Sequence, residues 1–566
     1  MSDWQKDPSQ LFSVVSGLAN EANSRIYQTA ALFRMYEPTM VLNTPLAQLF
    51  QTPITYATDA PRLNIYSQII RHAHNYFARS FPKAVFLPVG ANKTTRDQAE
   101  SLTQFVDGCF LAGDLQTHAR RALLHAVISG TGIIKVIDTG ETPTYEWVLP
   151  TEIFCLDGET LYGSPQSLYQ RKQISREMAK GLWPEVAGKL TFENPANGDM
   201  VTVIEAWSLP QGKTKGRHAI VLEPNLVVLD EKYEQKRFPF AVYRFIEPAI
   251  GYWGIGLGQI LSPYQIQINR ILKNIEANIH LGGNLKLLID TASGVSGKHI
   301  TNDLRGNIVQ YTGNPPKYLT QPLVSPDILQ HLDMIISQMW KASRFGENQG
   351  VGALPPGINS RVAMLTASDI MAENHSTTGK QWEEFFLDLA ELTIDAAKRI
   401  SEREGDVKVV WKNSNALEQR SLKECLDKDL DYRIEVRASS RIRDSVAGRM
   451  ELADWLAQSG IWGPQDILEA IDLPSVFGDI ELDLAPSKNI DSYLNAIAAG
   501  EPKAPHPKLD LQLAKTKAMK FINHLEHTGA DEESITRVSE WIDEIDRLLA
   551  QAEPPPEEMP LPQQQG

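Results

Sequence analysis

Two stretches in the middle of the chain repeat apolar residues at helical spacing. In the first stretch, apolar side chains return every three or four residues after Ser262-Pro263, a pair that favours a helix start: Tyr264, Ile268, Ile271, Ile275 and Ile279. In the second stretch, the apolar positions are Ile328, Leu332, Ile335, Met339 and Trp340. Each stretch predicts an amphipathic helix, and the first, over residues 261–280, would form a rod of about 30 Å.

Short β-like runs lie between the two predicted rods, at residues 285–289 and 307–311. The glycines that separate and flank these runs are Gly294, Gly297, Gly306 and Gly313. Pro315-Pro316 then ends the second run, and glycine and proline of this density mark turns. The pattern predicts two rods joined by a small tip that contains β-strands.

A glycine-rich loop follows the second rod at residues 346–357 and contains Pro355-Pro356. A long helical pattern then starts near Ser360. Its apolar positions include Trp382, Phe386, Leu389 and Ile394. The order is therefore rod, small tip, rod, glycine-rich loop and long helix.

The residues before the first rod predict helices followed by an α+β region. Helices are expected at residues 11–36, 63–77 and 96–110, and another ends at Gly130, directly before a strand at 133–137. Further strands are expected at 147–154, 201–207, 219–222, 226–229 and 240–245, with a helix near 175–183. This alternation predicts an antiparallel sheet with one helical insertion.

The residues after the long helix predict two more strands and then helices. The strands, at 407–411 and 432–436, flank a charged helix and are expected to return to the same sheet. Helical texture resumes after Ser445, and two helices at 509–527 and 531–550 complete the folded part. The tail at 551–566, rich in Pro and Gln, is expected to be disordered.

Composition and charge limit the possible functions. With 42% hydrophobic residues among 566, the chain has enough apolar material for a core. The formal net charge of −15 argues against a protein that wraps nucleic acid over its whole surface, although a local basic lining remains compatible with it. The N-terminus has no basic-then-apolar signal pattern, and no run of about 18 apolar residues occurs, so we expect a soluble protein without membrane partners.

The cysteines and histidines predict no metal site. Cys109, Cys155 and Cys425 are odd in number and far apart, which supports neither a disulfide framework nor a cysteine zinc site and fits a reducing compartment. The spaced histidine pairs are His72 with His74 and His524 with His527. Neither pair has a neighbouring acidic or cysteine cluster, and zinc needs three or four ligands, so solvated helix faces are expected.

Two glycine motifs also fall short of a nucleotide site. Gly212-Lys213-Thr214 matches the end of a P-loop, but Trp207 occupies the place of its first glycine, so we expect a charged hairpin turn. In the series Gly254, Gly256 and Gly258, Gln259 occupies the place of the third glycine of a dinucleotide motif. This series predicts a kinked approach to the first rod. The chain contains no catalytic signature, so we expect a protein that is not an enzyme and binds no cofactor.

The order of predicted elements resembles the portal proteins of tailed double-stranded DNA bacteriophages, most closely at residues 118–138 and 251–400. In terms of that family, residues 1–250 would form N-terminal helices and the wing, 251–281 the first stem helix, 282–325 the clip and 326–345 the second stem helix. The tunnel loop would be 346–359, the tunnel helix 360–403, the wing return strands 404–444 and the helical crown 445–550.

The resemblance implies an assembly and partners. Portal proteins form a closed ring of about twelve copies at one vertex of the capsid, so this chain would be a virion component made in the host cytoplasm. The ring passes double-stranded DNA during packaging and ejection. Its implied partners are the major capsid protein, the terminase packaging motor and the tail adaptor. The rods agree with assembly, because a lone hairpin of amphipathic helices would expose apolar faces to water.

A DNA channel needs phosphate contacts that are weak and independent of sequence. The candidates on the rods and in the following loop are Arg270, Lys273, Lys341, Arg344, Glu347, Asn348 and Gln349. The candidates for docking the motor and the adaptor, in the locally basic tip, are Lys286, Lys298, Arg305 and Lys317. For each basic residue, a solvated rod face or a salt bridge between subunits is an equally good interpretation.

Two other classes of function stay open. A different oligomeric virion protein, such as a tail or baseplate component, would keep the self-assembly and lose the DNA channel. An enzyme that processes nucleic acid would require a nucleotide or metal site, which the sequence does not show.

Overall fold

The computed structural model divides the chain into two compact units, Met1–Arg79 with Cys109–Glu404 and Ser80–Gly108 with Gly405–Gly566. It describes residues 4, 7–37, 63–79, 81–88, 93–161, 164–189, 199–223, 225–283, 286–295, 311–315, 317–319, 325–346, 373–412, 417–425, 432–437, 486, 489–494, 496–498, 500, 503–506, 509–528 and 532–552. Helix accounts for 59% and strand for 20% of the described residues, so the predicted α+β class is confirmed.

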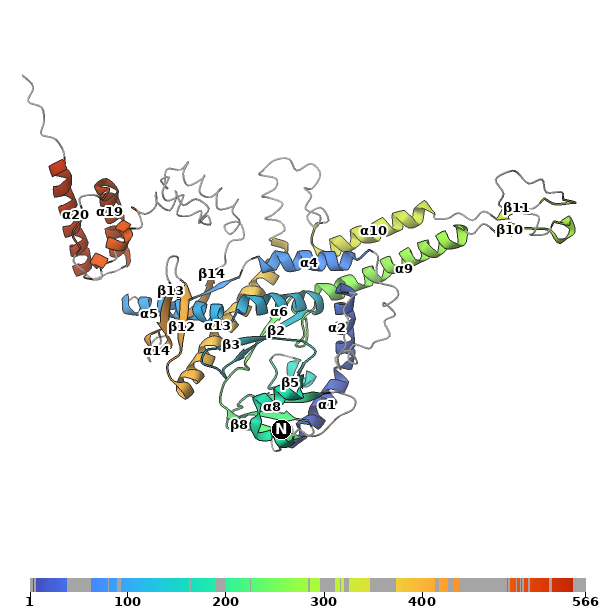
Figure 1. Cartoon of the computed structure of the whole chain (residues 1–566), viewed down its shortest axis with the longest axis horizontal. Helices are drawn as coiled ribbons and strands as arrows, with labels where there is room; N and C mark the ends of the chain where they lie inside the picture. Colours follow the sequence, from blue (N-terminus) through green and yellow to red (C-terminus); the bar gives the residue numbers. More distant parts are fainter. Residues whose placement is uncertain are drawn as a thin grey trace, which may run out of the picture. The chain divides into compact units, whose positions relative to one another are not determined.

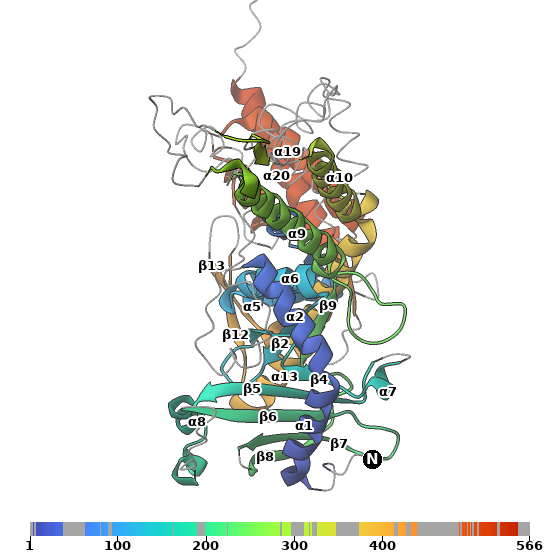
Figure 2. The same cartoon turned by 90° about the vertical axis from the view of Figure 1, so that its right-hand side faces the viewer.

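Two antiparallel sheets form the centre of the first unit (Figures 1 and 2). The larger has the order β4-β5-β6-β7-β8, with the bounds Ile153–Phe154, Ser167–Ser175, Met200–Ser208, Gly216–Leu222 and Leu226–Tyr233. The smaller has the order β3-β2-β9, with the bounds Thr144–Val148, Thr131–Ile137 and Phe240–Arg244. The sequence predicted one sheet and missed β5, because the polar run Gln170, Arg171 and Lys172 interrupts alternation.

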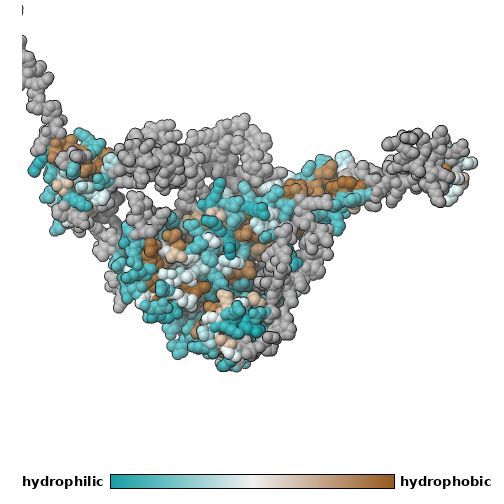
Figure 3. Space-filling view, in the orientation of Figure 1, coloured by the Kyte–Doolittle hydropathy of each residue, from teal (hydrophilic) through white to brown (hydrophobic). Residues whose placement is uncertain are grey.

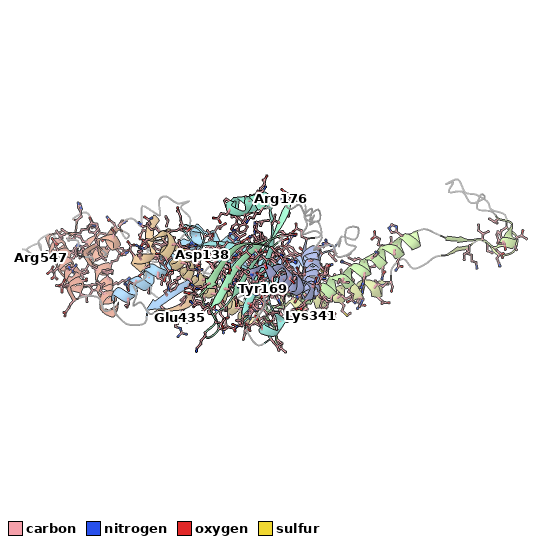
Figure 4. All side chains as sticks on the ribbon, turned by 90° about the horizontal axis from the view of Figure 1, so that it is seen from below. Asp138, Tyr169, Arg176, Lys341, Glu435 and Arg547 are labelled. Atoms are coloured by element: carbon pink, nitrogen blue, oxygen red, sulfur yellow. The ribbon has the colours of Figure 1, made fainter. Side chains whose placement is uncertain are left out.

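Helices cover the outer faces of the two sheets. α6 (Leu115–Ser129) and α13 (Ser376–Glu404) pack on the smaller sheet, and α1 (Leu11–Glu21) packs on the larger one. Beside α1, the indole of Trp4 donates a 2.8 Å hydrogen bond to the hydroxyl of Tyr169, which is labelled in Figure 4. Between the sheets, Ile133, Trp207 and Phe240 belong to one apolar cluster. The sheets therefore stack as inner layers of one body.

The predicted N-terminal helices are confirmed with changed bounds. They are α1, α2 (Asn23–Tyr36), α4 (Ile65–Ala78) and α5 (Lys93–Ala112). The predicted single helix at 11–36 is interrupted at Ala22, whose N–H still bonds to the Leu18 carbonyl. The predicted helix at 175–183 is α8 (Arg176–Leu182). Short elements complete the first unit: η2 (Pro8–Gln10), α7 (Asp157–Thr160), η3 (Pro184–Lys189) and η4 (Thr291–Ser293).

The two predicted rods are α9 (Leu257–Gly283) and α10 (Pro326–Ser343), which lie side by side in Figures 1 and 2. The expected start after Ser262-Pro263 is wrong, because α9 begins six residues earlier, at Leu257, and continues through Pro263. Proline has no N–H to bond to the Gln259 carbonyl. The Ser262 hydroxyl donates to that carbonyl at 3.3 Å instead, which compensates for the missing bond.

The strands between the rods differ from the prediction. β10 (Lys286–Leu288) confirms the first expected strand, but its partner is β11 (Lys317–Leu319), directly after Pro315-Pro316. Of the second expected strand, residues 307–310 lie outside the described residues, and Tyr311 belongs to no strand. Prolines that were taken to end a strand therefore precede one.

The second unit contains strands that the sequence assigned elsewhere. β12 (Lys408–Lys412) pairs with β13 (Leu417–Ser421), which replaces the expected charged helix, and the helix α14 (Leu422–Cys425) is short. β14 (Tyr432–Arg437) pairs with β1 (Lys83–Pro88). The expected return of these strands to the sheet of residues 131–246 is therefore wrong, and residues 80–108 separate from the N-terminal region.

The two predicted C-terminal helices are confirmed as α19 (Leu511–Thr528) and α20 (Glu532–Ala552). With a preceding helical segment they enclose their own apolar cluster, which includes Leu494, Ala518 and Trp541. Lys515 pairs with Asp546 at 2.7 Å and ties α19 to α20. The other expectations for residues 347–372, 438–485 and 553–566 lie outside the described residues.

Candidate nucleic-acid interface

The first rod begins on a set of closely packed glycines, which we call the glycine joint: Gly130, Gly132, Gly254, Gly256 and Gly258. A Cβ on Gly130 would lie 2.1 Å from the Gly254 carbonyl oxygen, and Gly130 has φ of +99°. A Cβ on Gly256 would lie 2.5 Å from the Gly130 nitrogen. The segment before α9 therefore rests directly on the turn between α6 and β2, where side chains have no room. The predicted kinked approach is this joint.

A buried glutamine holds α9 against α4. Gln265 is fully buried, and its amide donates a 2.9 Å hydrogen bond to the Leu63 carbonyl. Its side-chain oxygen accepts from the Tyr66 N–H at 3.0 Å, so it satisfies a free N–H in the first turn of α4. Because a buried amide that lost these partners would cost about 1–3 kcal/mol, Gln265 fixes the relation between the two helices. A polar residue at this position gave no signal in the apolar pattern.

The base of α10 packs against α4 through rings. Phe345 stacks on His375 with centroids 4.3 Å apart, and both side chains are buried. His72 and Tyr76 of α4 meet the Phe345 ring edge-on. Phe345 and His375 therefore lie side by side although they are far apart in the sequence. The predicted loop candidates between them, Glu347, Asn348 and Gln349, lie outside the described residues.

The four predicted basic candidates on the rods are exposed. Arg270 and Lys273 lie midway along α9, whereas Lys341, labelled in Figure 4, and Arg344 lie at the end of α10 that packs on α4. The four basic residues therefore lie at two levels along the helical hairpin and do not form a single cluster. Arg344 ends α10 with φ of +61°, a left-handed conformation that favours glycine.

Charge on the rods is nearly balanced. Three acidic side chains, Glu276, Asp327 and Asp333, oppose the four basic ones, which leaves a formal charge of +1 against −15 for the whole chain. By formal charge, the rods are therefore less negative than the chain as a whole.

Apolar side chains are also exposed in the half of the rods farther from the glycine joint. Ile279 on α9 is 48% exposed, and Leu329 and Met334 on α10 are 49% and 48% exposed. Figure 3 shows a brown hydrophobic stretch along the paired rods. We call these three residues together the distal apolar face; Leu329 and Met334 are five positions apart and lie on different sides of α10, so apolar surface is exposed on more than one side of this rod. Closer to the joint, Leu261, Ile268 and Met339 have no exposed surface.

The predicted docking residues of the tip are only partly described. Lys317 is exposed on β11, and Lys286 lies on β10 in register with Leu319. Lys298 and Arg305 lie outside the described residues. Asp290, an acidic residue of the tip, caps η4 by accepting a hydrogen bond from the Ala292 N–H at 3.0 Å. Its carboxylate is therefore committed to the turn.

One cavity in the first unit, ≈ 300 Å³ in volume, lies beside α1 and α2. Arg25 lines it, stacks 3.7 Å above the Trp253 ring, and donates to the carbonyls of Pro150 and Ile153. Burial lowers the pKa of Arg25 to about 10. Its guanidinium is thus engaged in holding α2 to the sheet, and we assign the cavity no chemistry.

The remaining sequence motifs are placed as follows. Gly212, with φ of +55°, and Lys213 form the turn of the hairpin between β6 and β7, where Gln211 N–H bonds to the Thr214 carbonyl, which confirms the predicted hairpin turn. Within the described ranges, no three His, Cys, Asp or Glu side chains group closely enough to hold a metal ion. None of the described helices has the length and apolar character needed to cross a bilayer.

Comparison with known proteins gave no relative: no protein-family model matches the chain, and no curated protein matches it significantly.

Proposed function

We propose that this chain is a portal protein of a tailed bacteriophage, which forms a closed ring at one capsid vertex and passes double-stranded DNA. In this proposal α9 and α10 are the stem, the β10–β11 hairpin belongs to the clip and α13 is the tunnel helix. The packaging motor and the tail adaptor would bind at the clip, and the major capsid protein would surround the ring. The virion would then be its site of action.

The observation that carries this proposal is the hairpin of two rods, fixed at its base and apolar at its distal end. The glycine joint and Gln265 hold α9 on the body, so the distal apolar face has no freedom to fold back onto it. Soluble proteins seldom leave such a face in water. Copies related by a rotation that closes would cover it, with α9 of one copy against α10 of the next.

The exposed basic side chains support a role for the inner surface of such a ring. Arg270, Lys273, Lys341 and Arg344 lie at two levels along the rods, so each level would become a ring of positive charge in the assembly. Weak contacts at several levels let a duplex slide, whereas one strongly basic band would hold it. The absence of any nucleotide motif from the sequence fits a conduit that works beside a separate motor.

Two double variants with the same change in net charge test the DNA contact. In Arg270→Glu/Lys341→Glu, two exposed basic groups on the rods are reversed; in Lys180→Glu/Lys232→Glu, two exposed lysines of the wing region are reversed. Fluorescence anisotropy with a short labelled duplex would measure affinity against salt. We expect the first variant to bind at least tenfold more weakly at low salt, with the salt slope reduced by about two, and the second to behave as the wild type.

Equal affinities for the two variants would remove the assignment of these residues to the channel. If the ring still formed, that result would favour another oligomeric virion protein over a portal. Failure to form a ring in any condition would overturn the proposal itself.

A further inference from the structure

An ion pair joins the facing sides of the two sheets and continues as a line of charged side chains across the larger sheet. Lys135 of β2 forms an ion pair with Glu205 of β6, with 2.5 Å between Nζ and Oε2. The other oxygen of Glu205 lies 3.0 Å from Nε2 of His218 on β7. Nδ1 of His218 lies 2.8 Å from a carboxylate oxygen of Glu231 on β8. We call these four residues the inter-sheet charge cluster.

The geometry around His218 defines its protonation state. Both ring nitrogens face carboxylate oxygens, which accept hydrogen bonds and cannot donate them. The imidazole satisfies both carboxylates only when both nitrogens carry a proton. Burial lowers the pKa of His218, but hydrogen bonds and charges from Glu205 and Glu231 outweigh burial and leave that pKa above its ordinary value. Trp207 stacks on the ring with an interplanar angle of 9° and shields it from water.

The charged and polar groups that face His218 come from two strands, β6 and β8. Glu205 is buried, which raises its pKa, but Lys135 and His218 together lower the pKa to about 2. Glu205 therefore stays ionised at every physiological pH. Tyr233, on the same strand as Glu231, lies edge-on to the imidazole. Its hydroxyl donates a hydrogen bond to the Arg237 carbonyl. The cluster thus has one group, His218, whose ordinary pKa lies near neutral pH and is raised by its two carboxylate neighbours.

A second titrating group lies next to the cluster. Glu152, after β3, accepts a 3.4 Å hydrogen bond from Gln170 of β5, and Gln170 in turn accepts from Lys135. Burial raises the pKa of Glu152 to about 7, although Gln170 and Lys172 oppose the shift. Lys172 is itself paired with Glu146 of β3 at 2.5 Å, which forms a second ionic contact between the sheets.

The charges of this region balance only at lower pH. With His218 protonated and Glu152 neutral, three positive side chains face three negative ones, and the region has no net charge. The positive set is Lys135, Lys172 and His218, and the negative set is Glu146, Glu205 and Glu231. When His218 loses its proton and Glu152 ionises, the net charge becomes −2; Glu231 is 55% exposed and screened by solvent, whereas Glu205 is only 17% exposed. Uncompensated buried charge is costly.

We propose that the inter-sheet charge cluster, together with Glu152, is a pH-dependent device that stabilises the larger sheet and its contact with β2 at mildly acidic pH and loosens both as pH rises. This inference is independent of the proposed function. The sign follows from linkage. A histidine with a raised folded-state pKa gives full stabilisation below its ordinary value of about 6.5 and loses it as pH rises through the folded-state value. Glu152 acts in the same direction over a lower range: the folded state keeps its proton up to about pH 7, whereas an unfolded glutamate loses it near its ordinary value, so its contribution falls between these two values.

Hydrogen exchange of the full-length protein between pH 6 and 9, read by mass spectrometry and corrected for the intrinsic chemical rate, tests the device. We expect the opening equilibrium of peptides from β2, β5 and β6 to rise at least tenfold over this range. Peptides from α19 and α20, which have their own core, serve as the internal reference and should show no such rise.

Two variants locate the effect. Glu152→Gln cannot ionise and should flatten part of the rise. Glu231→Gln removes one negative charge beside His218 and should shift the rise to lower pH. His280→Gln changes a histidine whose side chain is 78% exposed and should match the wild type. Unchanged protection of the wild type from pH 6 to 9 would overturn the proposal. Profiles of both cluster variants that overlay the wild type would do the same.

Discussion

Helices α13 and α9 are of similar length, 29 and 27 residues, and both carry an apolar stripe, yet they bury it differently. The stripe of α13 is buried from Trp382 to Ile400 against the smaller sheet and its surroundings. The stripe of α9 is buried at Leu261 and Ile268 but reaches 48% exposure at Ile279. An apolar stripe therefore indicates that a helix has an apolar surface to bury. Only the three-dimensional structure shows whether the same chain buries it.

The difference follows from what lies beside each helix. α13 packs on β2 and β9, so its apolar stripe from Trp382 to Ile400 is covered within the first unit. α9 meets α4 and α6 near the glycine joint and has α10 as its described neighbour beyond them. Two helices can cover one side of each other and leave the remainder of each stripe exposed. The proposed ring is a partner for that remainder.

The largest effect should come from truncating a covered stripe. Trp382 stacks on Phe385 at 5.4 Å and meets Tyr243 edge-on at 5.0 Å, so Trp382→Ala would leave a large cavity. We expect it to lower the free energy of unfolding by about 3–5 kcal/mol. Ile279→Ala, in the exposed stripe, should change that quantity by less than about 0.5 kcal/mol in dilute protein. Urea denaturation followed by tryptophan fluorescence and circular dichroism would measure both free energies of unfolding. Equal losses of stability in the two variants would contradict the difference in burial between α13 and α9.

A smaller but still large effect is expected at the joint that fixes α9. Gly130→Ala places a Cβ on the Gly254 carbonyl and forces alanine into the left-handed region. We expect a loss of about 3 kcal/mol in unfolding free energy from strain and overpacking together. Gly181→Ala in α8, where a Cβ meets nothing within 4 Å, is the matched control and should be neutral or slightly stabilising. An undiminished stability of Gly130→Ala would show that the joint does not fix the rod.

The smallest effect concerns the end of α10. Arg344 occupies the left-handed region at φ of +61°, so Arg344→Gly should stabilise the chain by up to about 1 kcal/mol. The same change removes one exposed positive charge and should weaken DNA binding slightly. A shift in melting temperature measured by calorimetry would check the sign. A clear decrease in stability would mean that the arginine side chain packs at this position more than its exposure indicates.

The periodicity of apolar residues predicted which helices and strands form better than it predicted which of them pack or pair with one another. The stripes of α9, α10 and α13 and the alternation in β2, β6 and β9 follow from local sequence, and all of these elements were expected. The pairing of β1 with β14 joins residues about 350 positions apart, and no local pattern carries that information. The same holds for β11, which follows two prolines and has only three residues.

The candidate site was predictable to a similar degree. Exposure of Arg270, Lys273, Lys341 and Arg344 agrees with their positions outside the apolar stripes. The glycine series before α9 signalled a special backbone, but its contact with Gly130 depends on a turn more than 120 residues earlier. Gln265 and His218 have meaning only through their partners on other elements, so sequence reasoning passed over both. The roles of buried polar residues of this kind can be identified only from the three-dimensional structure.

The central claim is that the distal apolar face is covered by other copies of the chain in a closed ring. Native mass spectrometry of the purified protein, with electron microscopy down the symmetry axis, tests it most directly. We predict a ring of about twelve copies with an open centre wide enough for a DNA duplex, which Leu329→Glu disrupts. Leu161→Glu, at a leucine that is 45% exposed outside the rods, should leave the ring intact. A monomer or dimer at every concentration and salt would contradict the account.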